Sequence, residues 1–235
     1  MSYTTKCDLY RAINRFRSEC LLERTDNVAA ECERRGWAKV IEYPFATIGL
    51  KGMSYLARSG RERNIIMLRK ALSREEKNFT CAHELIHVKF HNNLHIATFQ
   101  CFDKIRPNQN SILEWQANEG AAELLVPLCE FLPIIKENLP GLKTWQDFES
   151  FDFELARYFS TTNGVIKIRY EDLKYEIYQY LNEVPLDRIE ILSRKMQRSR
   201  GIRVESLNDI EDRLWQKEFG NYHIDIVAED NHVEA

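Results

Sequence analysis

The sequence predicts an α+β fold that is predominantly helical, with a small sheet in the first third of the chain. Apolar residues recur at helical spacing near the N-terminus and over most of the chain after residue 73. Three short β-favouring runs lie together between residues 39 and 69. Because the strands are grouped and do not alternate with helices, the pattern is typical of the α+β class.

Composition agrees with a folded globular protein. The chain has 235 residues, of which 44% are hydrophobic and 29% are charged, enough for one large domain or for a domain with an appendage. The formal net charge of -3 gives no overall attraction to nucleic acid or to an anionic membrane. No charge-free run approaches the roughly 18 apolar residues of a membrane span, and the N-terminus lacks the features of a secretory signal. We therefore expect a cytoplasmic protein.

The six cysteines are scattered, without a CxxC pair or a repeated spacing. This distribution argues against a zinc ribbon and against a disulfide-stabilised scaffold. In a reducing compartment we expect them to act as small hydrophobic residues.

Two helices and three strands are expected in the first 70 residues. Leu9, Ile13, Phe16 and Cys20 follow helical spacing, and a second helix over residues 27–35 ends at Gly36, a residue suited to a position just beyond a helix. The strands are expected at residues 39–43, 52–56 and 64–68, and a polar, glycine-containing turn separates the last two.

The helices that follow are marked by their ends. Ser73 and Glu76 form a capping-box pattern that opens a helix reaching about His91. A second helix is predicted from Ile112 to Val126, before Pro127. Further helices are expected over residues 153–159, over residues 165–181 and after residue 185 with a break at Gly201; the acidic residues 228–235 are expected to fray.

Residues 83–87 read His-Glu-Leu-Ile-His, an HExxH pattern, inside a helix that was predicted from its cap and periodicity alone. Side chains four residues apart lie on one face of a helix, so His83 and His87 can converge on one tetrahedral metal ion. Glu84 lies beside them, where it can carry a proton. The pattern favours a zinc site, while two unrelated histidines on one helix is the alternative.

A catalytic zinc ion needs a third protein ligand in addition to an open position for water. A metzincin would place a third histidine and a glycine where this chain has Asn93 and Phe90, so that class is excluded. The other common solution is a glutamate on a later helix. The next helix offers three of them: Glu114, Glu119 and Glu123.

Glu114 is the preferred third ligand among these glutamates. It begins its helix, and Asn118 follows one turn later, where its amide could hydrogen-bond to a ligand and orient it. Glu119 and Glu123 are weaker alternatives: Glu119 is one position from Asn118 and points elsewhere on the helix, and Glu123 lies two turns further on, where it could only support the site. A further residue, His91, is expected to support or pack against the site, and His95 is expected at the surface.

The run SREEKNFTCAHELIHVKFH, followed by EWQANEGAAELLVP, resembles the paired motifs of the ImmA/IrrE family of metallopeptidases. Ala82 and His91 stand where that family has an alanine before the HExxH pattern and a histidine after it. The second motif is matched by Glu114, Ala117, Asn118, Ala121, Ala122, Leu124, Leu125 and Pro127. The resemblance covers about residues 25–175, with departures from the family pattern at Ile86, Gly120 and Val126.

The resemblance implies a zincin-like fold and a gluzincin-type peptidase. Zinc, or manganese as a second choice, would be held by His83, His87 and Glu114, with Glu84 as the catalytic base. The implied substrate is a protein, commonly a helix-turn-helix transcriptional repressor whose cleavage switches on a mobile element or stress genes. The implied domains are the zincin-like domain at 1–150, a helix-turn-helix-like pair at 151–183 and a helical extension of unassigned role at 184–235.

Two other functional classes are consistent with parts of the sequence. A non-enzymatic, metal-containing regulator would act by binding a partner protein, but a purely structural metal site needs no proton carrier such as Glu84. A DNA-binding regulator would use residues 153–181, but Lys167 and Arg169 are followed by Glu171 and Asp172, so direct nucleic-acid binding is disfavoured.

An extended substrate is expected to pair with an exposed strand edge, since backbone pairing presents a peptide bond independently of its side chains. The candidate strands are residues 52–56 and 64–68.

Overall fold

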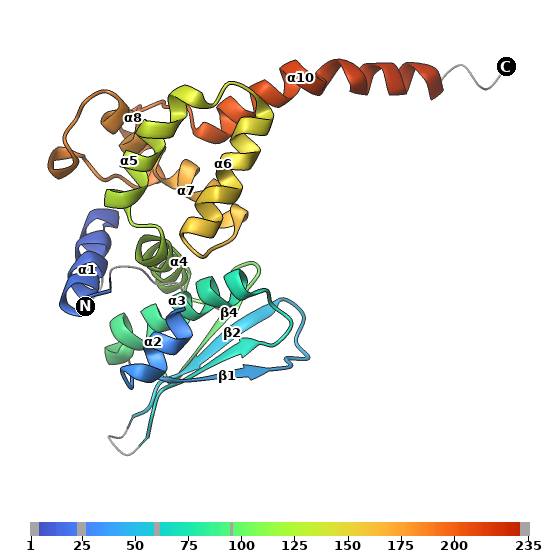
Figure 1. Cartoon of the computed structure of the whole chain (residues 1–235). Helices are drawn as coiled ribbons and strands as arrows, with labels where there is room; N and C mark the ends of the chain where they lie inside the picture. Colours follow the sequence, from blue (N-terminus) through green and yellow to red (C-terminus); the bar gives the residue numbers. More distant parts are fainter. Residues whose placement is uncertain (1–4, 23–26, 59–61, 95, 231–235) are drawn as a thin grey trace. The chain divides into compact units, whose positions relative to one another are not determined.

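The computed structural model describes residues 5–22, 27–58, 62–94 and 96–230, the last ten by their backbone alone (Figure 1). The chain divides into two compact units. The first comprises Met1–Pro127 and Ala156–Val165, and the second comprises Leu128–Leu155 and Ile166–Ala235. Helices and a mixed sheet are both present, which confirms the α+β class. The domain boundaries expected after residues 150 and 183 stay predictions.

Over the described residues the first unit contains one four-stranded sheet in the order β1-β3-β2-β4. The strands are β1 (Lys39–Tyr43), β2 (Leu50–Tyr55), β3 (Ile65–Arg69) and β4 (Thr98–Phe102). β1 pairs with β3 in parallel, while β2 pairs antiparallel with both β3 and β4. The three predicted strands are confirmed in position.

The expected three-stranded sheet was wrong in one respect, because β4 joins it from beyond the HExxH helix. The substrate edges proposed from the sequence were also wrong. β2 and β3 each have a partner on both sides, so neither has a free edge. The strand edge next to the HExxH helix belongs to β4, whose one partner among the described strands is β2.

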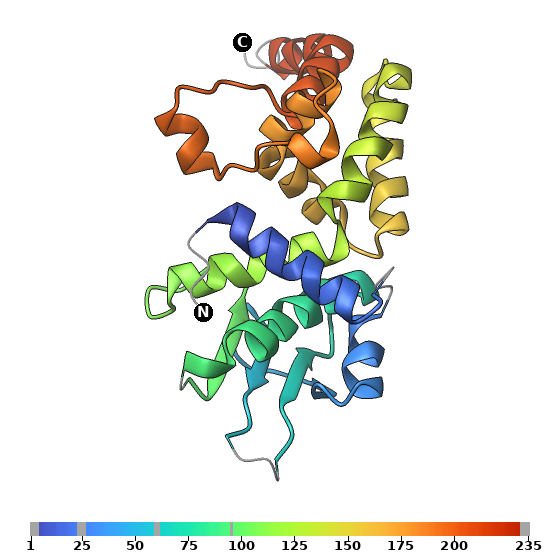
Figure 2. The same ribbon diagram turned by 90° about the vertical axis from the view of Figure 1, so that its left-hand side faces the viewer.

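Four helices complete the first unit: α1 (Lys6–Glu19), α2 (Val28–Arg34), α3 (Arg74–Phe90) and α4 (Ser111–Leu125). α3 packs on β2, β3 and β4, α4 packs on α3, and α1 lies across α4 (Figures 1 and 2). The predicted capping box is confirmed: the Glu76 amide donates to Ser73 Oγ at 3.1 Å, and the Ser73 amide donates to Glu76 Oε2 at 3.0 Å. The HExxH pattern therefore lies in a long helix with a fixed start.

Two hydrogen bonds, one buried and one partly buried, join α1 to α4. The Tyr10 hydroxyl donates to Glu119 Oε1, and Asn14 Nδ2 donates to Glu123 Oε1 at 2.9 Å. Both glutamates are buried, so these polar partners reduce the large free-energy cost of removing a carboxylate from water. Helix α4 is thus oriented by α1, with Glu119 and Glu123 directed toward that helix.

The second unit is helical over its described residues. It contains α5 (Leu128–Asn138), α8 (Lys174–Leu181), α9 (Arg194–Ser199), α10 (Leu207–Asp230) and most of α6 (Trp145–Tyr158) and α7 (Asn163–Asp172). The single helix predicted over 165–181 is two helices that meet at Leu173, and α5, with Pro133 inside it, was not predicted. α10 continues to Asp230, so the expected fraying of 228–230 was wrong, and 231–235 lie outside the described residues.

The basic residues of α7 are engaged within the second unit. Lys167 Nζ lies 3.2 Å from Asp152 Oδ2 and 2.5 Å from Glu211 Oε2. The Arg169 side chain is completely buried. The charge of Lys167, which is partly exposed, is thus paired with two carboxylates, and Arg169 does not reach the surface.

No helix in the described part of the chain carries an apolar stretch long enough to cross a bilayer.

Gly52 allows α3 to approach β2 closely. A Cβ atom at this position would lie 2.5 Å from Thr80 Cγ2 and 3.3 Å from Glu84 Oε1, both on α3. Gly52→Ala should therefore lower the free energy of unfolding by roughly 1–3 kcal/mol through overpacking. Urea unfolding of the purified variant measures this loss.

The close contact between a new Cβ atom at position 52 and Thr80 can be removed by a second substitution. Thr80→Ser deletes the methyl group that a new Cβ would meet and keeps the hydroxyl. The double variant Gly52→Ala/Thr80→Ser should regain a large part of the free energy of unfolding that Gly52→Ala loses. It should therefore be more stable than the sum of the two single effects predicts. Strict additivity of the two changes would contradict a steric cause.

Candidate metal centre

His83, His87 and Glu114 converge at the contact between α3 and α4. Their ligand atoms all lie within 4.8 Å of one another, and the three side chains are buried. His83 Nε2 lies 3.2 Å from His87 Nε2 and 3.3 Å from Glu114 Oε2, while His87 Nε2 lies 3.8 Å from Glu114 Oε1. Ligand atoms about 2.0–2.2 Å from a tetrahedral zinc ion lie roughly 3.3–3.6 Å apart, so the spacing suits such an ion.

Hydrogen bonds made by His83, His87 and His91 determine which ring nitrogens face the centre without a proton. The side-chain oxygen Oδ1 of Asn118 lies 2.9 Å from His83 Nδ1, and the side-chain oxygen Oε1 of Gln116 lies 2.9 Å from His91 Nε2. Because an amide oxygen can only accept, both ring nitrogens must donate. Neutral His91 then accepts at Nδ1 from His87 Nδ1, 2.8 Å away.

In these hydrogen bonds Nδ1 of His83 and of His87 carries the proton. When both rings are neutral, the lone pair of each Nε2 is therefore directed toward Glu114. Burial, followed by the neighbouring histidines, lowers the pKa of His87 well below its usual value, and burial also lowers the pKa of His91. Both rings are therefore neutral near pH 7, as the hydrogen bonds require.

The pKa of His83 shifts in the opposite direction. Although burial favours the neutral ring, Cys101 and Glu114 raise the pKa of His83 well above its usual value. Three acceptors at one buried point thus attract a positive charge, which a proton supplies when no cation is bound. A divalent cation would take the place of that proton, so the donor set fits a metal ion.

Glu84 lies beside this centre with its two carboxylate oxygens in different surroundings. Oε2 accepts a 2.6 Å hydrogen bond from Ser54 Oγ on β2. Oε1 is buried and has no hydrogen-bond partner among the described residues. Burial raises the pKa of Glu84 to about 7, against the opposing effects of His83 and Ser54. One oxygen is therefore held in place, and the other can accept a proton near neutral pH.

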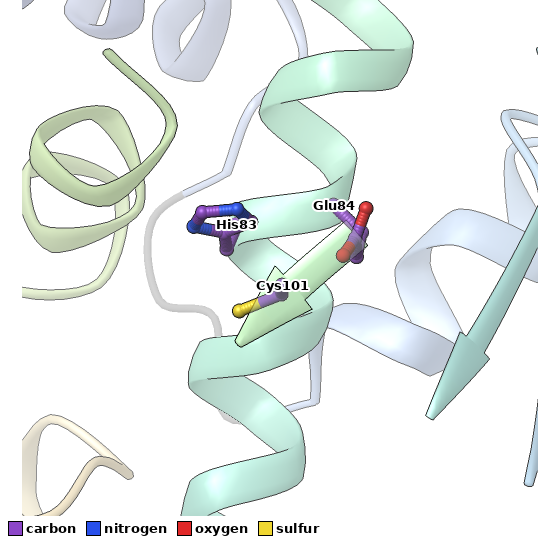
Figure 3. A group of neighbouring side chains, drawn as sticks. All are labelled: His83, Glu84 and Cys101. Carbon is purple, nitrogen blue, oxygen red and sulfur yellow. The ribbon is translucent and has the colours of Figure 1, made fainter. Parts of the chain in front are cut away.

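β4 contributes two side chains to the same region. The Phe99 ring stacks on His87, with centroids 4.0 Å apart and an interplanar angle of 14°. The Cys101 thiol forms a second group of possible ligands with His83 and Glu84, again within 4.8 Å (Figure 3). Figure 3 shows this thiol on β4, near the two α3 side chains.

The structure brings together most of the residues singled out in the sequence. His83, His87 and Glu114 meet, with Asn118 and His91 behind the two imidazoles, whereas Glu119 and Glu123 are directed toward α1. Their roles as ligands and supporting residues stay predictions. His95 lies outside the described residues.

Sequence reasoning missed four residues of this region: Ser54, Phe99, Cys101 and Gln116. Ser54 had a usable signal, because it shares the buried face of β2 with Leu50 and Gly52 and is the polar residue in that set. Phe99 and Cys101 were missed together with β4, although the run Thr98–Phe102 alternates between buried and partly exposed side chains.

Comparison with known proteins agrees with this geometry. No relative was found among curated proteins. The family model described as the IrrE N-terminal-like domain matches residues 32–171, which include every residue of the centre. This range is more than half of the 235-residue chain and closely follows the part in which the resemblance was expected. The protein therefore belongs to the ImmA/IrrE family of metallopeptidases.

Proposed function

We propose that this protein is a zinc-dependent, gluzincin-type peptidase in which His83, His87 and Glu114 bind the metal and Glu84 is the catalytic base. Family membership gives metallopeptidase activity and a protein substrate. The observation that supports the finer assignment is the convergence of three buried acceptors beside Glu84, one oxygen of which has no hydrogen-bond partner in the described part of the chain. Two nitrogen ligands and one oxygen ligand suit zinc, and manganese is the second candidate.

The reaction assigned to Glu84 is a pair of proton transfers. A bound cation would supply Lewis acidity, which lowers the pKa of water and polarises the scissile carbonyl. Glu84 Oε1 removes the proton of the attacking water and passes it to the leaving amine. Ser54 holds Oε2, so the carboxylate keeps one orientation during both transfers.

We assign the substrate to the outer edge of β4. The Leu56 amide donates to Ala97 O at 2.8 Å, which makes these residues a hydrogen-bonded pair in the antiparallel ladder between β2 and β4. Hydrogen-bonded pairs alternate along such a ladder, so the backbone groups of Thr98 and Gln100 face away from β2. An extended peptide can pair with them, and Gln100 lies between Phe99 and Cys101, the two β4 residues at the metal centre.

The proposed protein substrate is a helix-turn-helix transcriptional repressor, as the family resemblance implies, and its cleavage would occur in the cytoplasm. The six cysteines are free, which suits a reducing compartment. The test is incubation of the zinc-loaded protein with purified helix-turn-helix repressors of its own organism, followed by mass spectrometry of the products. An intact repressor would contradict this choice of substrate.

The purified wild-type protein should contain about one zinc ion per chain. His83→Ala and Glu114→Ala should each lose it, because two remaining ligands bind zinc far more weakly than three. Elemental analysis after removal of free metal measures the content. Glu119→Gln is the matched control: it changes a glutamate on the same helix and keeps an acceptor for Tyr10.

Loss of metal from Glu119→Gln, with retention in Glu114→Ala, would overturn the ligand assignment. Folded wild-type protein that takes up no zinc would overturn the zinc peptidase itself.

Gln116 should affect metal affinity without contacting the metal. Gln116→Met keeps the side-chain length but removes the acceptor of His91 Nε2–H, so the orientation of His91 and then of His87 is lost. Zinc affinity should fall by about tenfold to a hundredfold, measured by competition with a chromophoric chelator. Unchanged affinity would show that His87 needs no support from this side.

Glu84→Gln should abolish cleavage and leave the zinc content unchanged, since an amide cannot accept and return the proton. Product analysis and elemental analysis on the same sample separate the two properties. An active Glu84→Gln protein would refute the assignment of Glu84 as the base.

A further inference from the structure

The side chain of Gln109 already occupies a backbone group at the outer edge of β4. Gln109 Nε2 donates a 2.6 Å hydrogen bond to the carbonyl oxygen of Gln100. The ladder alternation turns this oxygen away from β2, and the 2.9 Å bond from the Asp103 amide to Gly49 O gives the same alternation at the other end of the strand. A carboxamide is chemically similar to a peptide group, so Gln109 makes the bond that the N–H of a paired strand would make.

The loop that carries Gln109 is fixed in this position by several contacts. Gln109 Oε1 accepts from the Arg106 amide at 2.8 Å, and the Gln109 amide donates to Arg106 O at 3.0 Å, which closes a tight turn. The Arg106 guanidinium lies over the Phe102 ring, 3.7 Å from its centroid, and donates to Ile48 O at 2.8 Å. The turn is therefore attached both to the end of β4 and to the segment that precedes β2.

The blocked carbonyl lies at the level of the metal centre. The side chains before and after Gln100 are Phe99, which stacks on His87, and Cys101, which lies near His83 and Glu84. A peptide that paired with β4 at Gln100 would pass directly beside these residues. Of the two residues whose backbone groups face outward in the middle of β4, Gln100 is thus the one adjacent to the catalytic groups.

We propose that Gln109 is a built-in competitor of the substrate, which occupies the Gln100 carbonyl in the free protein and is displaced when an extended peptide segment pairs with β4. This inference rests on the proposed function of the edge. Gln109 sets the affinity for every peptide equally, because it competes for a backbone group that every peptide uses. Only a peptide with enough additional contacts displaces it, so Gln109 raises the affinity that a peptide needs for binding and does not change the ratio of affinities between two peptides.

Binding of fluorescein-labelled, unfolded casein to zinc-loaded Glu84→Gln protein tests the proposal without catalysis. In the Glu84→Gln background, Gln109→Ala should lower the dissociation constant for casein roughly threefold to tenfold, because one competing hydrogen bond is removed. Gln109→Glu should act in the same direction when the added charge is screened by salt, because it keeps an acceptor for Arg106 but cannot donate to Gln100. Asn108→Ala, an exposed change in the same turn, should have no effect.

Unchanged or weaker casein binding by both Gln109 variants overturns the proposal, since Gln109 would then be neutral or would help to hold the peptide. Absence of binding by all of the proteins overturns it as well, because the opened edge would not be a peptide site. Failure of the proposed function is distinguishable: the Gln109 variants would bind casein more tightly, while zinc-loaded protein with an intact Glu84 would cleave neither casein nor the repressor.

Discussion

Three hydrogen-bond acceptors directed at one buried point repel one another unless a positive charge lies among them. The packing of α4 on α3 creates this situation by placing the Glu114 carboxylate against the two Nε2 atoms of the HExxH helix. A cation bound at the proposed site would offset the cost of assembling the acceptors, so it would also stabilise the contact between the helices. The remaining polar groups orient the ligands and do not neutralise them: Asn118 and Gln116, both on α4, fix the hydrogen-bonded nitrogens of His83 and His91.

The sheet provides the contacts that position Glu84 and cover the side of α3 away from α4. Alternate residues of β2 face α3, so Gly52 and Ser54 lie on the same side of the strand. Gly52 gives α3 the space to approach, and Ser54 then lies close enough to hold Glu84. β4 covers the next part of the helix with Phe99 and Cys101, and its outer backbone groups, of which the Gln100 carbonyl accepts from Gln109, face away from β2. Glu84, the proposed base, is therefore positioned by β2, and the outward-facing backbone groups belong to the neighbouring strand.

Features encoded over a few residues could be predicted from the sequence. Ser73 and Glu76 define the start of α3 because a capping box involves four consecutive residues, and the His83–His87 spacing is a property of the helix itself. The break at Leu173 was missed because periodicity continues across it, and β4 was missed because five residues after a turn give little pattern. Cys101 and Gln116 depend on strand pairing and helix packing between distant segments, which no local window contains. Glu114 is intermediate: its helix was predictable, but the direction of Glu119 and Glu123 became clear only with α1 in place.

The contact between α1 and α4 has a consequence for the order of events during synthesis. Tyr10 and Glu119 are 109 positions apart, and the same separation holds for Asn14 and Glu123. On the ribosome the HExxH helix emerges before α4, when the third acceptor and both orienting amides of the centre have not yet been made. At the proposed metal site the nascent chain would then have two histidines and no third ligand, so tight metal uptake would wait until the helix that ends at Leu125 has left the exit tunnel and packed against α1. Helix α1, which precedes α4 in the chain, is thus a contact surface for the helix that completes the proposed site.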